Sequence, residues 1–124
     1  MALDTDFIGD LFAAFGKVAT RRMFGGVGVF ADGLMIALVA DDVIYLKADE
    51  DLTAEFEREG LGPFSYPTKN GRHTILSFWR MPERLYDDPE ELAGWAQRSL
   101  DAARRGASRR RRGRQPAAAG GPGT

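Results

Sequence analysis

The chain has 124 residues, no cysteine and a formal net charge of −1, with 44% hydrophobic and 28% charged residues. This size and composition indicate one soluble globular domain, and the lack of cysteine excludes disulfides, thiolate metal sites and a cysteine nucleophile. The acidic N-terminus and the absence of a long apolar run predict a cytoplasmic protein that does not engage a membrane.

The first predicted element is an amphipathic helix. Apolar residues recur at helical spacing from Phe7 to Phe15, which places them along one stripe. Asp4 or Thr5 can cap the start of this helix, and Gly16 can close it.

Three apolar runs follow this helix, at 27–30, 34–39 and 43–47. The dipeptide Asp32-Gly33 is a strong signal for a hairpin turn, and Asp41-Asp42 turns the chain again. These signals predict three strands in an antiparallel meander.

A short helix and a second hairpin come next. Asp49 or Asp51 can cap the helix, and Gly60 can end it. The hairpin spans residues 64–79, with its turn at Asn70-Gly71. On its second strand Thr74, Leu76 and Phe78 are expected to face one way, opposite to His73, Ile75, Ser77 and Trp79.

A final helix begins near Asp88, which is a good N-cap. Pro89 suits the first helical position, and Glu91 completes a capping box. Gly106 is the expected C-cap. The buried stripe of this helix is predicted to hold Leu92, Trp95, Ala96, Ser99 and Ala103.

The predicted element order is α-β3-α-β2-α. Two antiparallel runs joined by a helix favour an α+β fold, with helices packed on one antiparallel five-stranded sheet. The folded domain is expected to span residues 1–106. Residues 107–124 are Arg-rich and then Gly/Pro/Ala-rich, and their lack of apolar periodicity predicts a disordered tail.

Gly25, Gly26 and Gly28 raise the question of a phosphate-binding loop. Such a loop lies between a strand and a helix and usually ends in Lys and Ser/Thr, whereas here neither residue type follows and the next element is a strand. We therefore expect positive φ or a bulge at Gly25 and Gly26, and close packing against a helix at Gly28. No cofactor is predicted.

Other candidate sites are weak. His73 is the single histidine, and Ser77 on the same strand face lies about 13 Å away, too far for a nucleophile–base pair. The acidic segments 41–42, 49–51 and 87–88 could bind metal, but turns and helix caps also favour Asp there. No catalytic or metal-binding residue is predicted, and a small basic patch could form from Arg21, Arg22, Arg72 and Arg80.

Charge is divided unevenly along the chain. Up to Asp101 there are ten basic residues against all 18 acidic ones, a net charge of −8. The remainder has no acidic residue and seven arginines. Such asymmetry suggests a polyanion partner, with a solvated solubility tail as the alternative. The candidate nucleic-acid-binding residues are Arg104, Arg105, Arg109, Arg110, Arg111, Arg112 and Arg114.

Two long segments resemble the TfoX N-terminal domain family, named for the regulator of natural competence. They are "RRMFGGVGVFADGLMIALVADDVIYLKAD" and "PFSYPTKNGRHTILSFWRMPERLYDDPEELAGWA", and the resemblance covers about residues 3 to 104. The matched positions include Met23, Phe24, Gly25, Gly26, Gly28, Asp32, Gly33, Trp79, Pro82 and Trp95. The resemblance implies an α-β3-α-β2-α fold similar to secretion-chaperone-like proteins, some of which dimerise.

The resemblance also carries a functional expectation. Full-length relatives regulate competence genes and have a second, C-terminal domain, and the family supplies no catalytic residues to transfer. We therefore expect a non-enzymatic regulatory or interaction module that binds a protein partner. The chain could also form a homodimer. The alternatives are a non-specific binder of DNA or RNA through the arginine tail and, least favoured, an enzyme of unknown class.

Overall fold

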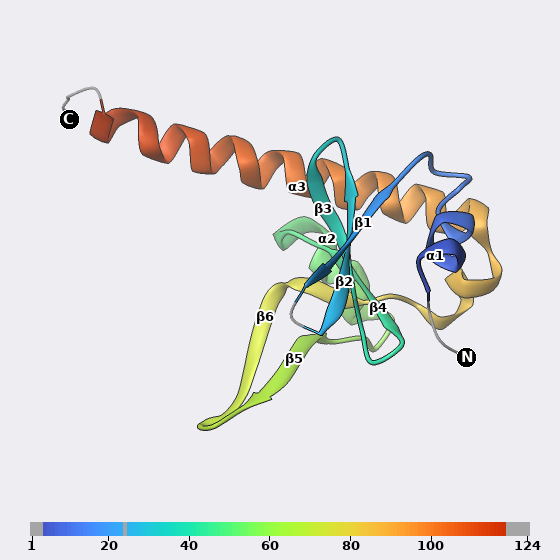
Figure 1. Ribbon diagram of the computed structural model, residues 1–124. Coiled ribbons are helices and arrows are strands. Elements are labelled where there is room, and N and C mark those ends of the chain that lie inside the picture. The colour runs from blue at the N-terminus through green and yellow to red at the C-terminus, as the bar shows by residue number, and fades with distance from the viewer. Residues whose placement is uncertain (1–3, 24, 119–124) are drawn as a thin grey trace.

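The computed structural model of the chain describes residues 4–23 and 25–118, and side chains as far as Arg110 (Figure 1). Phe24, residues 119–124 of the predicted tail, and the side chains of Arg111, Arg112 and Arg114 lie outside this description. The elements are α1 (Thr5–Leu11), β1 (Ala19–Met23), β2 (Gly26–Ala31), β3 (Leu34–Ala40), β4 (Val43–Lys47), α2 (Glu50–Arg58), β5 (Pro63–Thr68), β6 (Gly71–Arg80), the 3-10 helix η1 (Glu83–Asp87) and α3 (Pro89–Ala118).

The fold is α+β, with one open antiparallel sheet in the order β1-β2-β3-β4-β6-β5. Within the described residues the sheet has six strands, so the predicted five-stranded arrangement is wrong by one strand. The additional strand is β1, an edge strand that pairs with β2, from Ala19 opposite Phe30 to Met23 opposite Gly26. The sequence "ATRRM" has no alternation of apolar and polar residues, so it gives no strand signal. As an edge strand with exposed arginines, β1 buries little on either face.

The two faces of the sheet differ sharply. Register places Val29, Ala37, Leu46 and Trp79 in one row, and all four belong to the buried core with the helices. The opposite face, called here the second face, carries Arg21, Phe30, Tyr45, Phe64, Tyr66 and Arg80. Its apolar residues lie outside the main core cluster. The β5–β6 hairpin extends away from α1 and α3 (Figure 1).

The first two hairpin turns form as predicted. Asp32 and Gly33 have φ of 52° and 75°, and Asp41 and Asp42 have φ of 51° and 61°. Positive φ at both central residues matches the twist of the flanking strands. The turn of the β5–β6 hairpin lies one residue earlier than the predicted Asn70-Gly71, because Thr68 pairs with Gly71 and the loop is Lys69-Asn70.

The predicted N-caps are also found. Asp4 accepts a hydrogen bond from the Phe7 amide at 2.8 Å, and Asp49 accepts one from the Leu52 amide at 3.2 Å. Asp88 accepts one from the Glu91 amide at 3.1 Å. The capping box is incomplete, however, because the Glu91 carboxylate binds Arg84 instead of returning to Asp88.

Helix α3 is longer than the sequence predicts. Gly106 does not end it, and residues 107–118, where composition predicts disorder, continue the helix. A single glycine costs a helix only about 1 kcal/mol, while alanine and arginine are good helix formers. The predicted domain boundary at Gly106 therefore falls within α3. Across the described residues, no helix is long and apolar enough to cross a membrane.

Candidate functional site

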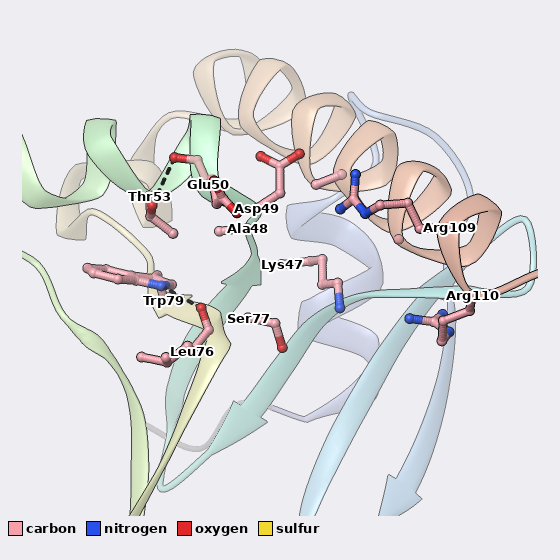
Figure 2. Close-up of a pocket in the computed structure, with 12 residues that line it drawn as sticks. Lys47, Ala48, Asp49, Glu50, Thr53, Leu76, Ser77, Trp79, Arg109 and Arg110 are labelled. Atoms are coloured by element: carbon pink, nitrogen blue, oxygen red, sulfur yellow. Dashed lines mark hydrogen bonds between the residues drawn. The ribbon is translucent and has the colours of Figure 1, made fainter. Parts of the chain in front are cut away.

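An open groove of about 650 Å³ lies where the second half of α3 passes the end of β4, the start of α2 and β6 (Figure 2). Its lining comes from residues distant in sequence. They are Lys47, Ala48, Asp49, Glu50, Thr53, Leu76, Ser77, Trp79, Ala102, Gly106, Arg109 and Arg110.

Cationic groups occupy one side of the groove. Figure 2 shows Arg109 and Arg110 on α3, with Lys47 projecting from β4 beneath that helix. Burial disfavours the charged ammonium of Lys47, and Arg110 adds positive potential, so both lower the pKa of Lys47. The ion pairs found among the described residues include none at Lys47, Arg109 or Arg110. The groove therefore favours an anionic ligand.

Asp49 fixes the position of α3 beside this groove. Its Oδ1 caps α2, and its Oδ2 accepts a hydrogen bond from Arg105 Nε at 2.7 Å. Burial raises the pKa of Asp49, but the hydrogen bonds from Arg105 and the Leu52 amide outweigh this and hold the pKa below its usual value. The carboxylate thus remains charged and joins α2 to α3.

The opposite side of the groove is apolar. Leu76 is 70% exposed, although it lies in the longest strand of the sheet. Leu76 lies within the stretch of β6 where the register with β5 shifts, between the Phe64–Ile75 and Pro63–Trp79 pairs. The Trp79 indole donates a hydrogen bond to the Leu76 carbonyl at 2.9 Å. Trp79 itself stacks on Phe56 in the core. The exposed Leu76 side chain and the neighbouring Trp79 give this side of the groove an apolar contact surface.

The structure separates the predicted nucleic-acid-binding arginines into groups. Arg104 pairs with Asp32, and Arg105 pairs with Asp49, so both are engaged by acidic residues of the folded body. Arg109 and Arg110 line the groove. The remaining three arginines, Arg111, Arg112 and Arg114, have side chains outside the described part.

The glycine motif lies within the sheet rather than in a phosphate loop. Gly25 has φ of 77°, as the turn requires. At Gly26 a Cβ atom would overlap the Val39 carbonyl, although φ is not positive there. At Gly28 a Cβ atom would meet Phe30 and Met23, so the expected close packing against a helix is wrong. The contact is with side chains of the second face.

The other predicted positions occupy structural places. Asp32-Gly33 forms a turn, and Pro82 precedes η1. Trp95 lies in the core, 5.0 Å from the Phe56 ring between centroids. His73 is exposed on β6. Its ring meets the Tyr66 ring edge-on, with the two centroids 5.4 Å apart. Over the residues that can be described, no group of three or more His, Cys, Asp or Glu residues is placed to hold a metal.

Sequence reasoning missed Lys47 and Leu76. Lys47 ends an apolar strand and gives no local signal, because its neighbours in the groove come from α3. Simple alternation places Leu76 on a strand face, but the irregular pairing of β5 and β6 interrupts that alternation. The signals that could point to them are weak: a lone cation closing "VIYLK" and a leucine between Ile75 and Ser77.

Comparison with known proteins gives a clear family. The chain matches the family described as TfoX N-terminal domain over residues 10–103. It is 29% identical over 89 residues to the DNA transformation protein TfoX1 of Aliivibrio fischeri, covering 72% of this chain and 42% of that protein. It is also 29% identical over 94 residues to Protein Sxy of Escherichia coli, covering 76% and 44%. The chain thus spans less than half the length of these relatives, and it belongs to the TfoX N-terminal domain family.

Proposed function

We propose that this chain is a non-enzymatic regulatory module that acts by binding a protein partner. Its membership of the TfoX N-terminal domain family supports a regulatory role, and one relative is named a DNA transformation protein. The finer proposal, control of transcription through that partner, extends this family relationship to the present chain.

The groove beside α3 is the proposed binding site, and an acidic segment with apolar side chains is the proposed occupant. The observation that carries this proposal is the combination of Lys47, Arg109 and Arg110 with the exposed Leu76 in one groove. A carboxylate near Lys47 would stabilise the charged ammonium and so offset the effects of burial and of Arg110 on its pKa. Apolar contact with Leu76 would add affinity.

Affinity capture from the native cytoplasm, with nuclease added, tests this proposal. The bait is the full chain, and the groove variant combines Arg110→Glu with Leu76→Ser. Both residues are exposed, so the fold should be retained. Arg58→Glu is the matched control, because Arg58 is an exposed cation of α2 away from the groove lining.

The expected result is a protein that wild type and Arg58→Glu retain and the groove variant loses. That protein must also bind the purified wild-type chain directly. Equal capture by the groove variant and wild type would refute the groove as the binding site.

Non-specific nucleic-acid binding through the end of α3 is the second candidate. It is favoured because Arg109 and Arg110 are exposed and outside the ion pairs of the described residues. Since Arg104 and Arg105 already bind carboxylates, at most five of the seven arginines are free for phosphate. Five contacts predict a log–log salt slope on duplex DNA no steeper than about −4.5.

A salt titration of two unrelated DNA duplexes tests this second candidate. The comparison is the full chain with a variant carrying glutamine at positions 109–112 and 114, which preserves helix propensity while removing charge. Binding should be similar for both duplexes and should disappear in the variant. Strong preference for one duplex, or undiminished binding by the variant, contradicts it.

A further inference from the structure

The sheet differs in charge from the rest of the folded body. All six strands lie within the described residues, and none of them contains Asp or Glu. They contain five of the ten basic residues that precede Asp101. A body with a net charge of −8 therefore has a sheet that is purely cationic.

Register decides which of these cations share a face. Arg21 lies opposite Gly28, Gly28 opposite Leu38, Leu38 opposite Tyr45, and Tyr45 opposite Arg80. Opposed residues of antiparallel strands point to the same side. Arg21 and Arg80 are therefore both on the second face, whereas Arg22 points to the other face. Arg72 lies opposite Pro67, one position from the Tyr66/His73 pair, and binds Ser65, so it also points to the other face. Two members of the predicted patch therefore come together on the second face, and two do not.

Aromatic rings form a row on the same face. Tyr45 and Phe64 have centroids 4.8 Å apart, and Phe64 and Tyr66 have centroids 5.8 Å apart. The row continues onto the protruding hairpin, where Tyr66 is 41% exposed and contacts His73. Arg21 lies over a further ring of this face, with its guanidinium carbon 5.6 Å from the Phe30 centroid.

We propose that the second face binds single-stranded nucleic acid. Bases would stack on the aromatic row at its exposed end, Tyr66, and along the half-buried Phe64 and Tyr45, while Arg21 and Arg80 neutralise phosphates. Aromatic platforms joined to cationic grooves are how proteins hold unpaired strands, because every base has a stacking face. A duplex keeps its bases stacked on one another and could use only the cations.

Charge argues against a second copy of this chain as the occupant. Two copies joined through this face would bring cation against cation, with no acidic residue from any strand to compensate. A protein with acidic side chains would pair with the arginines of the second face, but it would have no planar groups that require the aromatic row. A nucleic-acid strand satisfies both features.

Fluorescence anisotropy with labelled oligonucleotides of about 15 nucleotides, one of deoxythymidine and one of uridine, tests the proposal on the full chain. A hairpin duplex of the same charge is the third probe. The variants are Tyr66→Leu, which keeps apolar character but removes the ring, and Arg21→Gln. Arg22→Gln is the matched control, an adjacent exposed arginine of β1 that points to the other face.

Both single strands should bind more tightly than the duplex. Tyr66→Leu should weaken single-strand binding about tenfold, as expected for loss of one stacked base. Arg21→Gln should weaken it several-fold at low salt, while Arg22→Gln and wild type stay about equal. Equal loss in Arg21→Gln and Arg22→Gln, absence of single-strand binding, or preference for the duplex would each overturn the proposal.

One more variant separates this site from the end of α3. In a chain with Arg→Gln substitutions at positions 109–112 and 114, adding Tyr66→Leu should still cause most of the loss of single-strand affinity that it causes in wild type. If that variant abolishes single-strand binding and Tyr66→Leu changes nothing, the nucleic acid lies on α3 and the second face is not its site. Thermal unfolding of each variant verifies that the fold is retained.

Discussion

Gly26 of β2 lies directly against the carbonyl of Val39 in β3, so that a Cβ atom on Gly26 would overlap that oxygen. The neighbour is backbone in a paired strand and cannot move aside without breaking sheet hydrogen bonds. The glycine is therefore required by strand packing.

Gly26→Ala should lower the free energy of unfolding by about 1–3 kcal/mol, because the strands must separate locally to admit the methyl group. Urea denaturation measures the change. Gly94→Ala is the matched control, since nothing lies within 4 Å of its Cβ position and it is inside α3. Alanine there should stabilise by about 0.5–1 kcal/mol. An unchanged stability for Gly26→Ala would show that the strands adapt.

Arg84 joins three elements through two carboxylates. From η1 it binds Glu59, just after α2, and Glu91 in the first turn of α3. Its guanidinium lowers the pKa of both glutamates through hydrogen bonds, and the Trp95 indole adds to the effect on Glu91. Stability from a lowered carboxyl pKa is present above the unfolded value of about 4.3 and is lost as pH falls through the folded pKa.

Arg84→Met should therefore lower the melting temperature at pH 7 but progressively less below about pH 4, where the carboxylates become protonated in both proteins. Thermal unfolding from pH 7 to pH 2 measures the difference from wild type. Arg58→Met, a substitution at an exposed arginine on α2, provides the control. A difference that stays constant across this range would mean that Arg84 acts through packing alone.

Local signals explain which parts of the fold could be predicted. The turn at Asp32-Gly33 and the caps at Asp4, Asp49 and Asp88 depend on residues within a few positions, and all are found. Strand β1 could not be found this way, because it is stabilised by pairing with β2 and carries no apolar pattern of its own.

Most of the candidate site could not be predicted from the sequence, for a similar reason. Lys47, Leu76 and Arg110 become neighbours only through the path of α3 over the sheet. The seven arginines looked equivalent in sequence, yet Asp32 and Asp49 engage two of them. Long-range pairing of this kind depends on the finished fold, which local periodicity does not encode.

Asp49 has two functions that substitutions can separate. Asp49→Asn would keep the cap on α2, since Asn and Asp cap equally well, but it would remove the charge that binds Arg105. This substitution should therefore cost less than about 1 kcal/mol, because Arg105 is half exposed. Asp49→Ala should cost about 1 kcal/mol more through loss of the cap. Urea denaturation of both variants measures this order, and equal losses would contradict it.

Ser99 is a buried polar residue of α3. Its side chain is fully buried, and its hydroxyl oxygen has no hydrogen-bond partner within the part of the chain described. A buried hydroxyl without a partner destabilises the folded state, and serine is also a weaker helix former than alanine. Ser99→Ala should therefore raise the free energy of unfolding by about 0.5–1.5 kcal/mol.

The reverse substitution, one turn away on α3, tests the same physical cause, which is the cost of burying a hydroxyl without a hydrogen-bond partner. Ala96 is fully buried on the same stripe of α3. Ala96→Ser places a new hydroxyl in the core and should lower the free energy of unfolding by about 1–3 kcal/mol. Guanidinium denaturation of both variants, with the slope checked for constancy, measures the pair. If Ser99→Ala instead destabilises the protein, its hydroxyl makes a hydrogen bond in solution, and the cost belongs to the loss of that bond.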